Sequence, residues 1–496
     1  MHLSLVQFAI VLLVALGSLS YGYSASIIST TLGQPTFLSY FHLDRASNAT
    51  QLIGAMNGLF QGGGLIGALS CFCLADNFGR KKALMAAALL TIIGGGLQSG
   101  SVHIAMYIVA RLITGIAVGA LLTLVPLYQS EIAPPQIRGL LVGMHGTMIC
   151  AGYSLSSWVG FGFYFVDASG AQWRIPLAFQ CVLPILLLSG LWLVPESPRW
   201  LLNNDRTDEA LTCFTATRAE SVDQEDTAGI DQEFQLLHSQ IVRERRNRAL
   251  WNDFFRKPSL RKRCLLGFGT MVAAQCTGTL VFANYSALLY HGLGFSVIRQ
   301  LLMQSIWITC SFVCNGLCAL IVDRVGRVRL LTIGLIGCLS SLIGEMTTLA
   351  VYEKTGSRAV ASGAVFFLFW QLFWYGCCVD ANTYIYTSEI FPTHLRARGL
   401  GVSISGLFAS SIIFVESAPT AFADVGYKYY ALFVSLNTIA IFVVYFTFPE
   451  TKGKRLEDIA AIFGDHITLE DTNMERLHRQ FQGEEKEGVA IMEVEN

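Results

Sequence analysis

Long apolar stretches alternate with short polar segments along almost the whole chain. A helix needs roughly 20 apolar residues to cross a hydrocarbon core of about 30 Å, and Gly and Pro within such a helix are compatible with lipid. Twelve stretches meet this requirement, and they predict an all-α integral membrane fold with twelve transmembrane helices. They lie near residues 4–30, 52–75, 83–100, 104–128, 139–165, 175–194, 264–290, 300–322, 329–351, 360–388, 399–421 and 428–448.

One long polar segment interrupts this alternation in the middle of the chain. Within it, TDEALTCFTATRAES and IDQEFQLLHSQIVRERRNRAL carry apolar residues at spacings of three and four. This spacing predicts short amphipathic helices that brace the bundle mouths, with a flexible linker as the alternative. We therefore predict a six-helix bundle (1–195), a cytoplasmic helical linker (196–263), a second six-helix bundle (264–448) and a polar tail (449–496). The tail is expected to form one short helix and then to be disordered.

Three polar blocks occur twice, about 250 residues apart. LADNFGRKK, at 74–82, returns as IVDRVGRVR, at 321–329, and PESPRW at Pro195 returns as PETKGK at Pro449. SEIAPPQIRG returns as SEIFPTHLRARG, and in both copies an Arg follows a Glu after seven residues. The chain is therefore a duplication of two similar halves, which favours a transporter that rocks one half against the other.

Composition and charge support a membrane protein with a defined orientation. The chain is 53% hydrophobic and only 14% charged. Of its 34 basic residues, 27 lie in the C-terminal tail or in the loops after the even-numbered spans, so this side and both termini are predicted to be cytoplasmic. The first span begins almost at Met1, but its apolar run is long for a signal peptide. The net charge of −1 gives no reason to expect nucleic-acid binding.

Few other motifs in the chain predict chemistry. The sequon at Asn48 falls in the first external loop, where a eukaryotic host could add a glycan. The thirteen Cys lie mostly within spans, where buried packing explains them better than disulfides or a metal site. No HExxH, GxSxG or phosphate-loop pattern occurs, so we expect neither an enzyme nor an ATP-driven pump, and no cofactor.

The polar blocks resemble those of the sugar-porter branch of the major facilitator superfamily, over nearly the whole chain. The matching motifs are the DxxGRR-like turns after spans two and eight, RxxxGxxxG from Arg111, PxxxxEIAPxxxRG from Pro126, PESPRW and PETKG. QWRIPLAFQ near Trp173 and SEIFPTHLRARG are most similar to fungal members. The resemblance implies two pseudo-symmetric six-helix bundles that hold a small solute between them near the membrane midplane.

The resemblance also implies a cytoplasmic gate of charged residues. Ion pairs among them would hold that side closed while the solute cavity faces outward. Each partly exposed pair contributes only about 0.2–1 kcal/mol, but a set of them can bias two conformations that differ by a few kcal/mol. Simple anchoring of loops is the alternative explanation. The gate residues are Arg80, Glu131, Arg138 and Glu196 in the first half and Arg327, Glu389, Arg396 and Glu450 in the second.

The predicted binding cavity departs from the family pattern. Sugar porters carry QQxSGxN in span seven, whose amides bind sugar hydroxyls, and only Gln275 and the Gly of that motif are kept here. Gly146 stands where a binding Gln is usual, Ser311 where an Asn is usual, and Tyr384 where a Trp commonly packs on the sugar. The candidates for solute contact are Gln275, Tyr285, Tyr384, Asn284, Asn315, Asn382, Thr383 and His145, with interhelical packing as the alternative for each.

The mode of energy coupling is left open by the sequence. Proton symport in this family resembles a span-one Asp acting beside the span-four Arg, and here Arg111 is present but Ser24 holds the Asp position. Because Ser24 cannot titrate, this substitution favours facilitated diffusion. Asp380 in span ten is the best substitute, since a central carboxylate costs about 2.5–3.5 kcal/mol and is rarely idle. It could couple protons, bind a cationic or hydroxyl group, or pair with another polar side chain.

The leading prediction is a secondary transporter that moves a sugar or related polyol across the plasma membrane as a monomer. The altered cavity also permits a cyclic acid such as quinate, or a specialised metabolite. A non-transporting nutrient receptor on the same fold is a third hypothesis. Such sensors resemble transporters with long cytoplasmic tails, whereas few residues follow Pro449.

Overall fold

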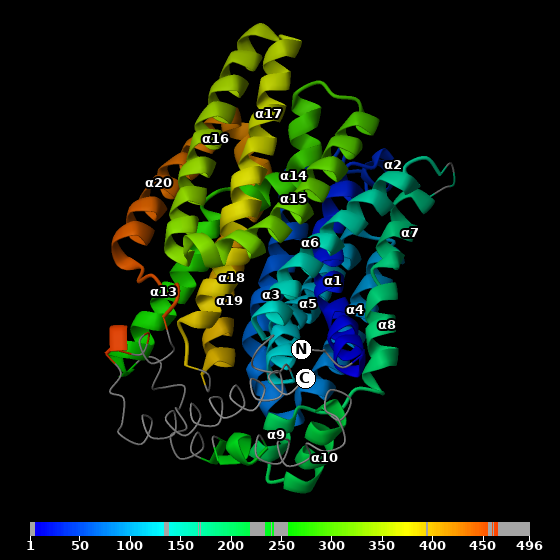
Figure 1. Ribbon diagram of the computed structural model, residues 1–496. Coiled ribbons are helices and arrows are strands. Elements are labelled where there is room, and N and C mark those ends of the chain that lie inside the picture. Colours follow the sequence, from blue (N-terminus) through cyan, green and yellow to red (C-terminus); the bar gives the residue numbers. More distant parts are fainter. Residues whose placement is uncertain are drawn as a thin grey trace, which may run out of the picture.

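Two helical bundles stand side by side in the protein (Figure 1). The computed structural model describes residues 5–132, 138–166, 168, 170–218, 234–239, 241–242, 256–392, 395–454, 459 and 461–464. Every regular element in this part of the chain is a helix. Helices α1–α8 form one bundle and α13–α20 the other, while α9 and α10 lie below them in Figure 1.

The first bundle contains the first six predicted spans. Five of these spans are single helices, and the sixth is made of the two short helices α7 and α8. The helices are α1 (Leu5–Leu32), α2 (Pro35–Tyr40), α3 (Ala49–Phe78), α4 (Arg80–Ser99), α5 (Ile104–Ile132), α6 (Arg138–Phe163), α7 (Ala171–Phe179) and α8 (Val182–Leu191).

The second bundle contains the other six spans, and two of them are interrupted. Helices α13 and α14 meet at a bend of 43°, and the tenth span passes through a π-helical turn, η1, an element that is frequent at functional sites. The elements are α13 (Pro258–Gln275), α14 (Thr279–Gly292), α15 (Val297–Val325), α16 (Arg327–Thr355), α17 (Arg358–Trp374), η1 (Tyr375–Asp380), α18 (Ala381–Glu389), α19 (Arg396–Val425), η2 (Gly426–Tyr429) and α20 (Tyr430–Thr447).

These elements confirm the prediction of twelve spanning helices. Within the described residues, nine stretches are long and apolar enough to cross a membrane, or ten if the bent pair α13–α14 is one span. One of the nine, Arg398–Thr447, includes both α19 and α20, and α6 is not among them. All twelve predicted stretches therefore coincide with a helix or with consecutive helices.

The segment between the bundles contains helices α9 (Pro198–Asn203) and α10 (Thr207–Arg218), the second of which was predicted as amphipathic. Their apolar residues form a small core with Phe234 and Ile241. The indole Nε1 of Trp200 donates to the carbonyl oxygen of Asp76 at 2.9 Å, so α9 is fixed to the end of α3. The second predicted linker helix is described only at 234–239 and 241–242, and the tail beyond 464 lies outside the described residues.

The two bundles contact each other at both ends. We call the end where α3 meets α4 and α15 meets α16 the ion-pair end, and the end where α1 meets α2 the opposite end. At the opposite end, Asn57 Nδ2 of α3 donates to the hydroxyl of Tyr285 on α14 at 2.9 Å. The Tyr285 hydroxyl donates in turn to the carbonyl of Val415 on α19 at 2.8 Å. Nearby, the hydroxyls of Ser29 and Ser286 lie 3.2 Å apart, so α14 is tied to the first bundle through two helices.

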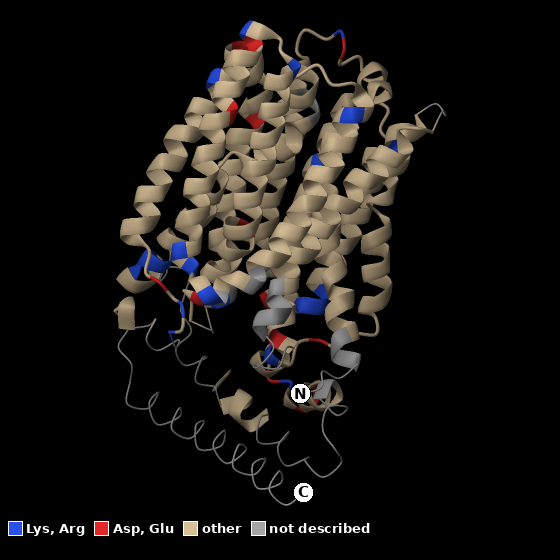
Figure 2. Cartoon of the chain, turned by 45° about the horizontal axis from the view of Figure 1, so that its top comes forward, with Lys and Arg blue, Asp and Glu red and all other residues tan. Residues whose placement is uncertain are grey.

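Charged residues are concentrated at the two ends of the bundles (Figure 2). The helix segments between the ends are almost free of them within the described part of the chain. Arg111 and Asp380 are the exceptions that the sequence singles out, and both lie deep within their bundles. The solvent around the middle of the helices must therefore be apolar, as lipid is.

Candidate functional site

The first half carries a charged cluster at the turn between α3 and α4. Gly79 has a φ of 95°, which Gly adopts without strain, and a Cβ there would lie 2.3 Å from Glu196 Oε2. The turn directs the Arg80 guanidinium toward α5. Its Nε donates to both carboxylate oxygens of Glu131, at 3.2 and 3.0 Å, and its Nη2 donates to Oε1 at 3.0 Å. Arg80 and Glu131 thus form a charge-assisted pair with several hydrogen bonds, the stronger kind of ion pair.

The second half repeats this cluster at the turn between α15 and α16. Gly326 has a φ of 109°, and a Cβ there would lie 2.9 Å from Glu450 Oε2. Arg327 Nε donates to the two carboxylate oxygens of Glu389 at 3.1 and 3.0 Å, and Nη2 donates to Oε1 at 2.7 Å. The repeated spacing in the sequence therefore corresponds to a repeat of the same contacts.

The remaining acid of each cluster binds the first backbone N–H groups of a helix. Glu196 Oε1 accepts from the backbone nitrogens of Arg80 and Lys81 at 2.9 and 3.0 Å, a position where a negative charge stabilises a helix N-terminus. Glu450 binds the start of α16 in the same way, from Arg327 N at 2.9 Å. Partial burial raises the pKa of Glu450, but backbone N–H groups outweigh it, so that its pKa lies below the ordinary value. These donors belong to Lys452, Arg327, Arg329 and Thr451.

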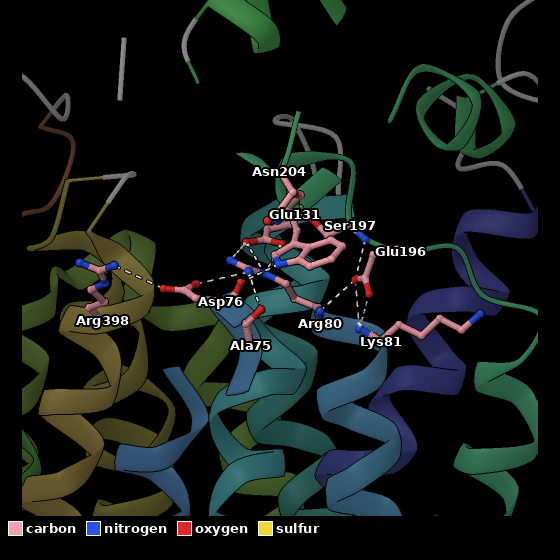
Figure 3. Close-up of polar contacts among 10 residues, drawn as sticks. Ala75, Asp76, Arg80, Lys81, Glu131, Glu196, Ser197, Asn204 and Arg398 are labelled. Atoms are coloured by element: carbon pink, nitrogen blue, oxygen red, sulfur yellow. Dashed lines mark hydrogen bonds and ion pairs between the residues drawn. The ribbon is translucent and has the colours of Figure 1, made fainter. Parts of the chain in front are cut away.

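One ion pair joins the two halves at this end in the described part of the chain (Figure 3). Asp76 Oδ1 accepts from Arg80 Nη1 at 3.4 Å, while its Oδ2 accepts from Arg398 Nη2 of α19 at 3.3 Å. Because the Asp76 carbonyl also accepts from Trp200, this residue connects the first cluster, the second half and α9. The pairs of Arg80 and Arg327, by contrast, each lie within one half.

The other two predicted gate residues, Arg138 and Arg396, each begin a helix. Arg138 begins α6, but its side chain lies outside the described residues. Arg396 begins α19, and its buried Nε has no hydrogen-bond partner among the residues described. Burial and the nearby charge of Arg199 lower the pKa of Arg396, whereas Glu389 raises it. A cationic side chain of α9, in the segment between the bundles, therefore lies close to Arg396.

Three of the candidate solute contacts, Asn315, His145 and Tyr384, lie near Asp380 between the halves. Asn315 Nδ2 of α15 donates to Asp380 Oδ2 at 2.6 Å, and Cys150 Sγ of α6 approaches the same oxygen at 3.6 Å. His145 of α6 lies with its ring centre 6.2 Å from that of Tyr384, and its Nδ1 is 2.7 Å from the hydroxyl of Ser18 in α1. We call Asp380, Asn315, Cys150, His145 and Tyr384 the central cluster.

The other candidates lie elsewhere. Tyr285 belongs to the contact at the opposite end described above. Asn284 Nδ2 donates to the Leu280 carbonyl of its own helix at 2.8 Å. Asn382 Nδ2 donates to the Arg327 carbonyl at 2.7 Å, and Thr383 Oγ1 donates to the Asp380 carbonyl at 2.7 Å, so both stabilise helix backbone. Gln275 is buried at the end of α13, next to the bend.

Arg111 and Asp380 are not brought together. Arg111 is fully buried, and its Nη1 donates to the Ser24 carbonyl of α1 at 3.0 Å. Its guanidinium carbon lies 4.0 Å from the ring centre of Phe60, a cation–π distance. Its Nη2 has no hydrogen-bond partner in the described part of the chain. Its Nε donates to the Met56 carbonyl at 3.4 Å, so the cation is held by two carbonyl groups and an aromatic ring.

Two further expectations concern single positions. Asn48 is exposed in the loop before α3, at the end of the molecule opposite the ion pairs, which is compatible with a glycan. Within the residues described, no group of three His, Cys, Asp or Glu is arranged to hold a metal ion.

Sequence reasoning missed several members of the site. Asp76 and Arg398 lie within the repeated blocks, but a pattern within each half does not show which residues meet across the halves. Cys150, Tyr21 and Tyr153 are apolar-looking span residues without a motif. Tyr21 belongs to a buried cluster between the halves against which Tyr153 and Tyr384 pack. The sequence alone therefore offered no signal for Cys150, Tyr21 and Tyr153.

Comparison with known proteins gives the family. A family model described as "Sugar (and other) transporter" matches residues 10–463. The chain is 32% identical to the MFS-type transporter criB of Aspergillus cristatus, over 92% of this chain and 93% of that protein. It is 29% identical to a high-affinity glucose transporter of Kluyveromyces lactis, over 91% and 84% of the two chains. A quinate permease of Neurospora africana is 27% identical, over 96% and 93%.

Solved structures show the same fold. A partially occluded, inward-open structure of the xylose transporter XylE from E. coli matches with a TM-score of 0.74. The alignment covers 90% of this chain and 99% of that one, at 24% identity. The two-bundle architecture is therefore the fold of that transporter.

Proposed function

This chain belongs to the family of sugar and other transporters, and we propose that it moves a sugar or related polyhydroxylated small molecule across a membrane by alternating access. The observation that carries this proposal is the pair of repeated ion-pair clusters at one end of two bundles that enclose a central polar cluster. Since a solute must enter from one side and leave from the other, the contacts at the two ends would break in turn.

The contacts within one half and the contacts between the halves have different roles. The Arg80–Glu131 and Arg327–Glu389 pairs each tie helices of one half together, so each half moves as a rigid body. The contacts between halves, Asp76–Arg398 at one end and Asn57–Tyr285 at the other, must break during the cycle. An exposed ion pair contributes about 0.2–1 kcal/mol, which is small enough for a transition between states a few kcal/mol apart.

We further propose the orientation that the basic loops predict. The ion-pair end and both termini face the cytoplasm, Asn48 faces outward and carries a glycan in a eukaryotic host, and the protein acts as a monomer in the plasma membrane. The start of α1 at the ion-pair end supports this orientation for the N-terminus, since the Val11 carbonyl accepts from Gln129, near the end of α5, at 3.3 Å. Its partners are the solute and the lipid bilayer, together with protons if transport is coupled to them.

Uniport and proton symport both fit this function. Arg111 is held by two carbonyl groups and Phe60 rather than by a carboxylate, which supports uniport. Asp380 is a half-buried carboxylate between the halves, which supports a proton site. Accumulation of solute against its gradient, abolished by an uncoupler, would establish symport, and equal uptake with and without the uncoupler would establish uniport.

The deciding experiment is uptake in a transport-deficient host that expresses the full chain. Labelled hexoses, pentoses, disaccharides, polyols and quinate are supplied separately, and we expect saturable entry of at least one polyhydroxylated solute. The Arg327→Ala variant, with surface expression verified, should reduce that entry. Expression at the surface without uptake of any solute in the panel would contradict the proposal and favour a receptor.

A second candidate substrate is a cyclic hydroxylated acid. The similarity to a quinate permease over 96% of this chain favours it. The loss of four of the usual amide contacts in the cavity is compatible with it as well. Quinate uptake without sugar uptake would select this alternative within the same transport mechanism.

A further inference from the structure

The central cluster presents hydrogen-bond acceptors that the described part of the chain does not satisfy. Both contacts of Asp380 are made by Oδ2, at 2.6 Å from Asn315 Nδ2 and 3.6 Å from Cys150 Sγ, and Oδ1 receives no hydrogen bond. Asn315 is 1% exposed, and its Oδ1 is buried without a partner. A buried polar group that lacks a partner, as Asn315 Oδ1 does, is destabilising. These two oxygens therefore favour an occupant that donates hydrogen bonds.

The charge of Asp380 is also uncompensated. No Lys, Arg or His side chain forms an ion pair with it in the described residues. Arg111, the other buried charge near the middle of the bundles, is directed toward Ser24 and Phe60. A lone carboxylate at membrane depth is costly. Both groups that contact Oδ2 are donors, an arrangement that suits the ionised form, so a cation is the complementary occupant.

Room for such an occupant lies beside these acceptors. A Cβ added to Gly146 of α6 would meet only Asn315 Oδ1 within contact range, at 3.7 Å. Asp380 itself is half-buried rather than sealed. Tyr21, Tyr153 and Tyr384 lie near enough for the charge of Asp380 to act on their hydroxyls. Tyrosine rings attract an ammonium group through their π faces, and they also accept or donate hydrogen bonds.

We infer that the transported solute carries a protonated amine, which binds Asp380 Oδ1 and Asn315 Oδ1 between α6 and η1. This inference rests on the proposed function and narrows it to an amino sugar or another hydroxylated amine. An ammonium group offers three donors and a positive charge, and so matches two acceptors and one carboxylate. A neutral hydroxyl offers a single donor and leaves the carboxylate charge unbalanced.

The test compares solutes that differ in this one group. The full chain is reconstituted in liposomes, and uptake of labelled glucosamine, glucose and N-acetylglucosamine is measured at a mildly acidic pH at which the amine is protonated. We expect kcat/KM for glucosamine to exceed that for either neutral sugar by about tenfold or more, the equivalent of one ion pair of about 1.4 kcal/mol. In Asp380→Asn the preference should fall to within about twofold, because the charge is lost while the amide keeps the shape.

The control is a second buried carboxylate of the same bundle. Glu345 of α16 is 2% exposed and accepts from the Tyr430 hydroxyl at 2.8 Å. Glu345→Gln keeps that acceptor and should keep the amine preference. Melting temperature in detergent verifies that both variants fold, and its rise with added glucosamine reports binding without transport.

Three results would overturn the inference. They are equal use of glucose and glucosamine by the parent protein, an undiminished preference in Asp380→Asn, and absence of both glucosamine binding and glucosamine uptake. If Asp380→Asn instead abolishes proton-driven accumulation of a neutral sugar, the residue is a proton site and the amine inference is wrong. In that case, or if neutral sugars alone are transported, the proposed function stands.

Discussion

The two ion-pair clusters repeat the same contacts but differ in how far water is excluded. The side chains of Arg80 and Glu131 are 9% and 8% exposed, whereas those of Arg327 and Glu389 are 12% and 26% exposed. The first cluster is held by Asp76 and, through it, by α9 of the linker. In the second cluster, the hydroxyl of Thr451 donates to Glu389 Oε2 at 2.7 Å.

This difference shows that two copies of a motif need not contribute equally to stability. An ion pair becomes stronger as water is excluded, but loss of one partner then leaves a charge that is costly to bury. The first cluster is therefore the more rigid anchor of its half. The second is the better candidate for adjustment during the transport cycle.

The largest expected effect is on stability, from Arg80→Ala. It leaves the buried carboxylate of Glu131 unpaired, and breaking a buried pair costs about 3–5 kcal/mol. We expect a marked loss of folded protein, measured as melting temperature and monodispersity in detergent. A melting temperature equal to that of the parent would contradict the anchoring role.

Arg327→Ala should have a smaller effect on folding and a clear one on transport. Glu389 is partly hydrated and keeps the Thr451 hydroxyl. The free energy of unfolding should therefore fall by about 1.5–3 kcal/mol, the contribution of hydrogen bonds to a charged group. The matched pair of variants measured side by side tests the comparison. If Arg327→Ala lowers the melting temperature more than Arg80→Ala does, the ranking of the clusters is wrong.

Asp76→Asn should leave stability nearly unchanged and shift the balance between conformations. The amide oxygen can still accept from Arg80, but the ion pair with Arg398 is lost, and such exposed pairs contribute about 0.2–1 kcal/mol. We expect faster labelling of a cysteine introduced at the ion-pair end between α3 and α19. Arg398→Gln serves as the partner control, and different labelling in the two variants would argue against a shared pair.

The smallest expected effect concerns acid stability in Glu450→Gln. The pKa of Glu450 is lower in the folded protein than its ordinary value. Ionised Glu450 therefore stabilises the fold above the ordinary carboxyl pKa of about 4.3, and this contribution is lost as the pH falls through the lowered value. The variant should show a slightly lower melting temperature at neutral pH and a weaker decline toward acid. Parallel curves for parent and variant would rule out this contribution.

The sequence predicted the twelve helices because a helix that crosses lipid needs a long run of apolar residues, and few other structures produce such a run. It also located Arg80, Glu131, Arg327 and Glu389 correctly at helix ends, because duplication makes functional spacing visible twice. The Asp76–Arg398 pair was not predictable, since which residues meet depends on the relative placement of the bundles.

The central cluster was predicted in part. Asp380 was conspicuous because a carboxylate is rare within a span, and His145, Asn315 and Tyr384 were flagged by comparison with family positions. Cys150 and the nearby tyrosines gave no signal, because such residues usually pack between helices. The π-helical turn that precedes α18 was not predictable either, because one extra residue in a single helical turn does not change the pattern of apolar residues along the sequence.

The hydrogen bond from Trp200 to the Asp76 carbonyl connects the segment between the bundles to the boundary between them. An antibody fragment that binds α9 and α10 from outside would displace Asp76, which contacts both halves, without contacting the solute. Turnover could then be slowed or speeded from the surface of the protein, with affinity for the cargo left intact.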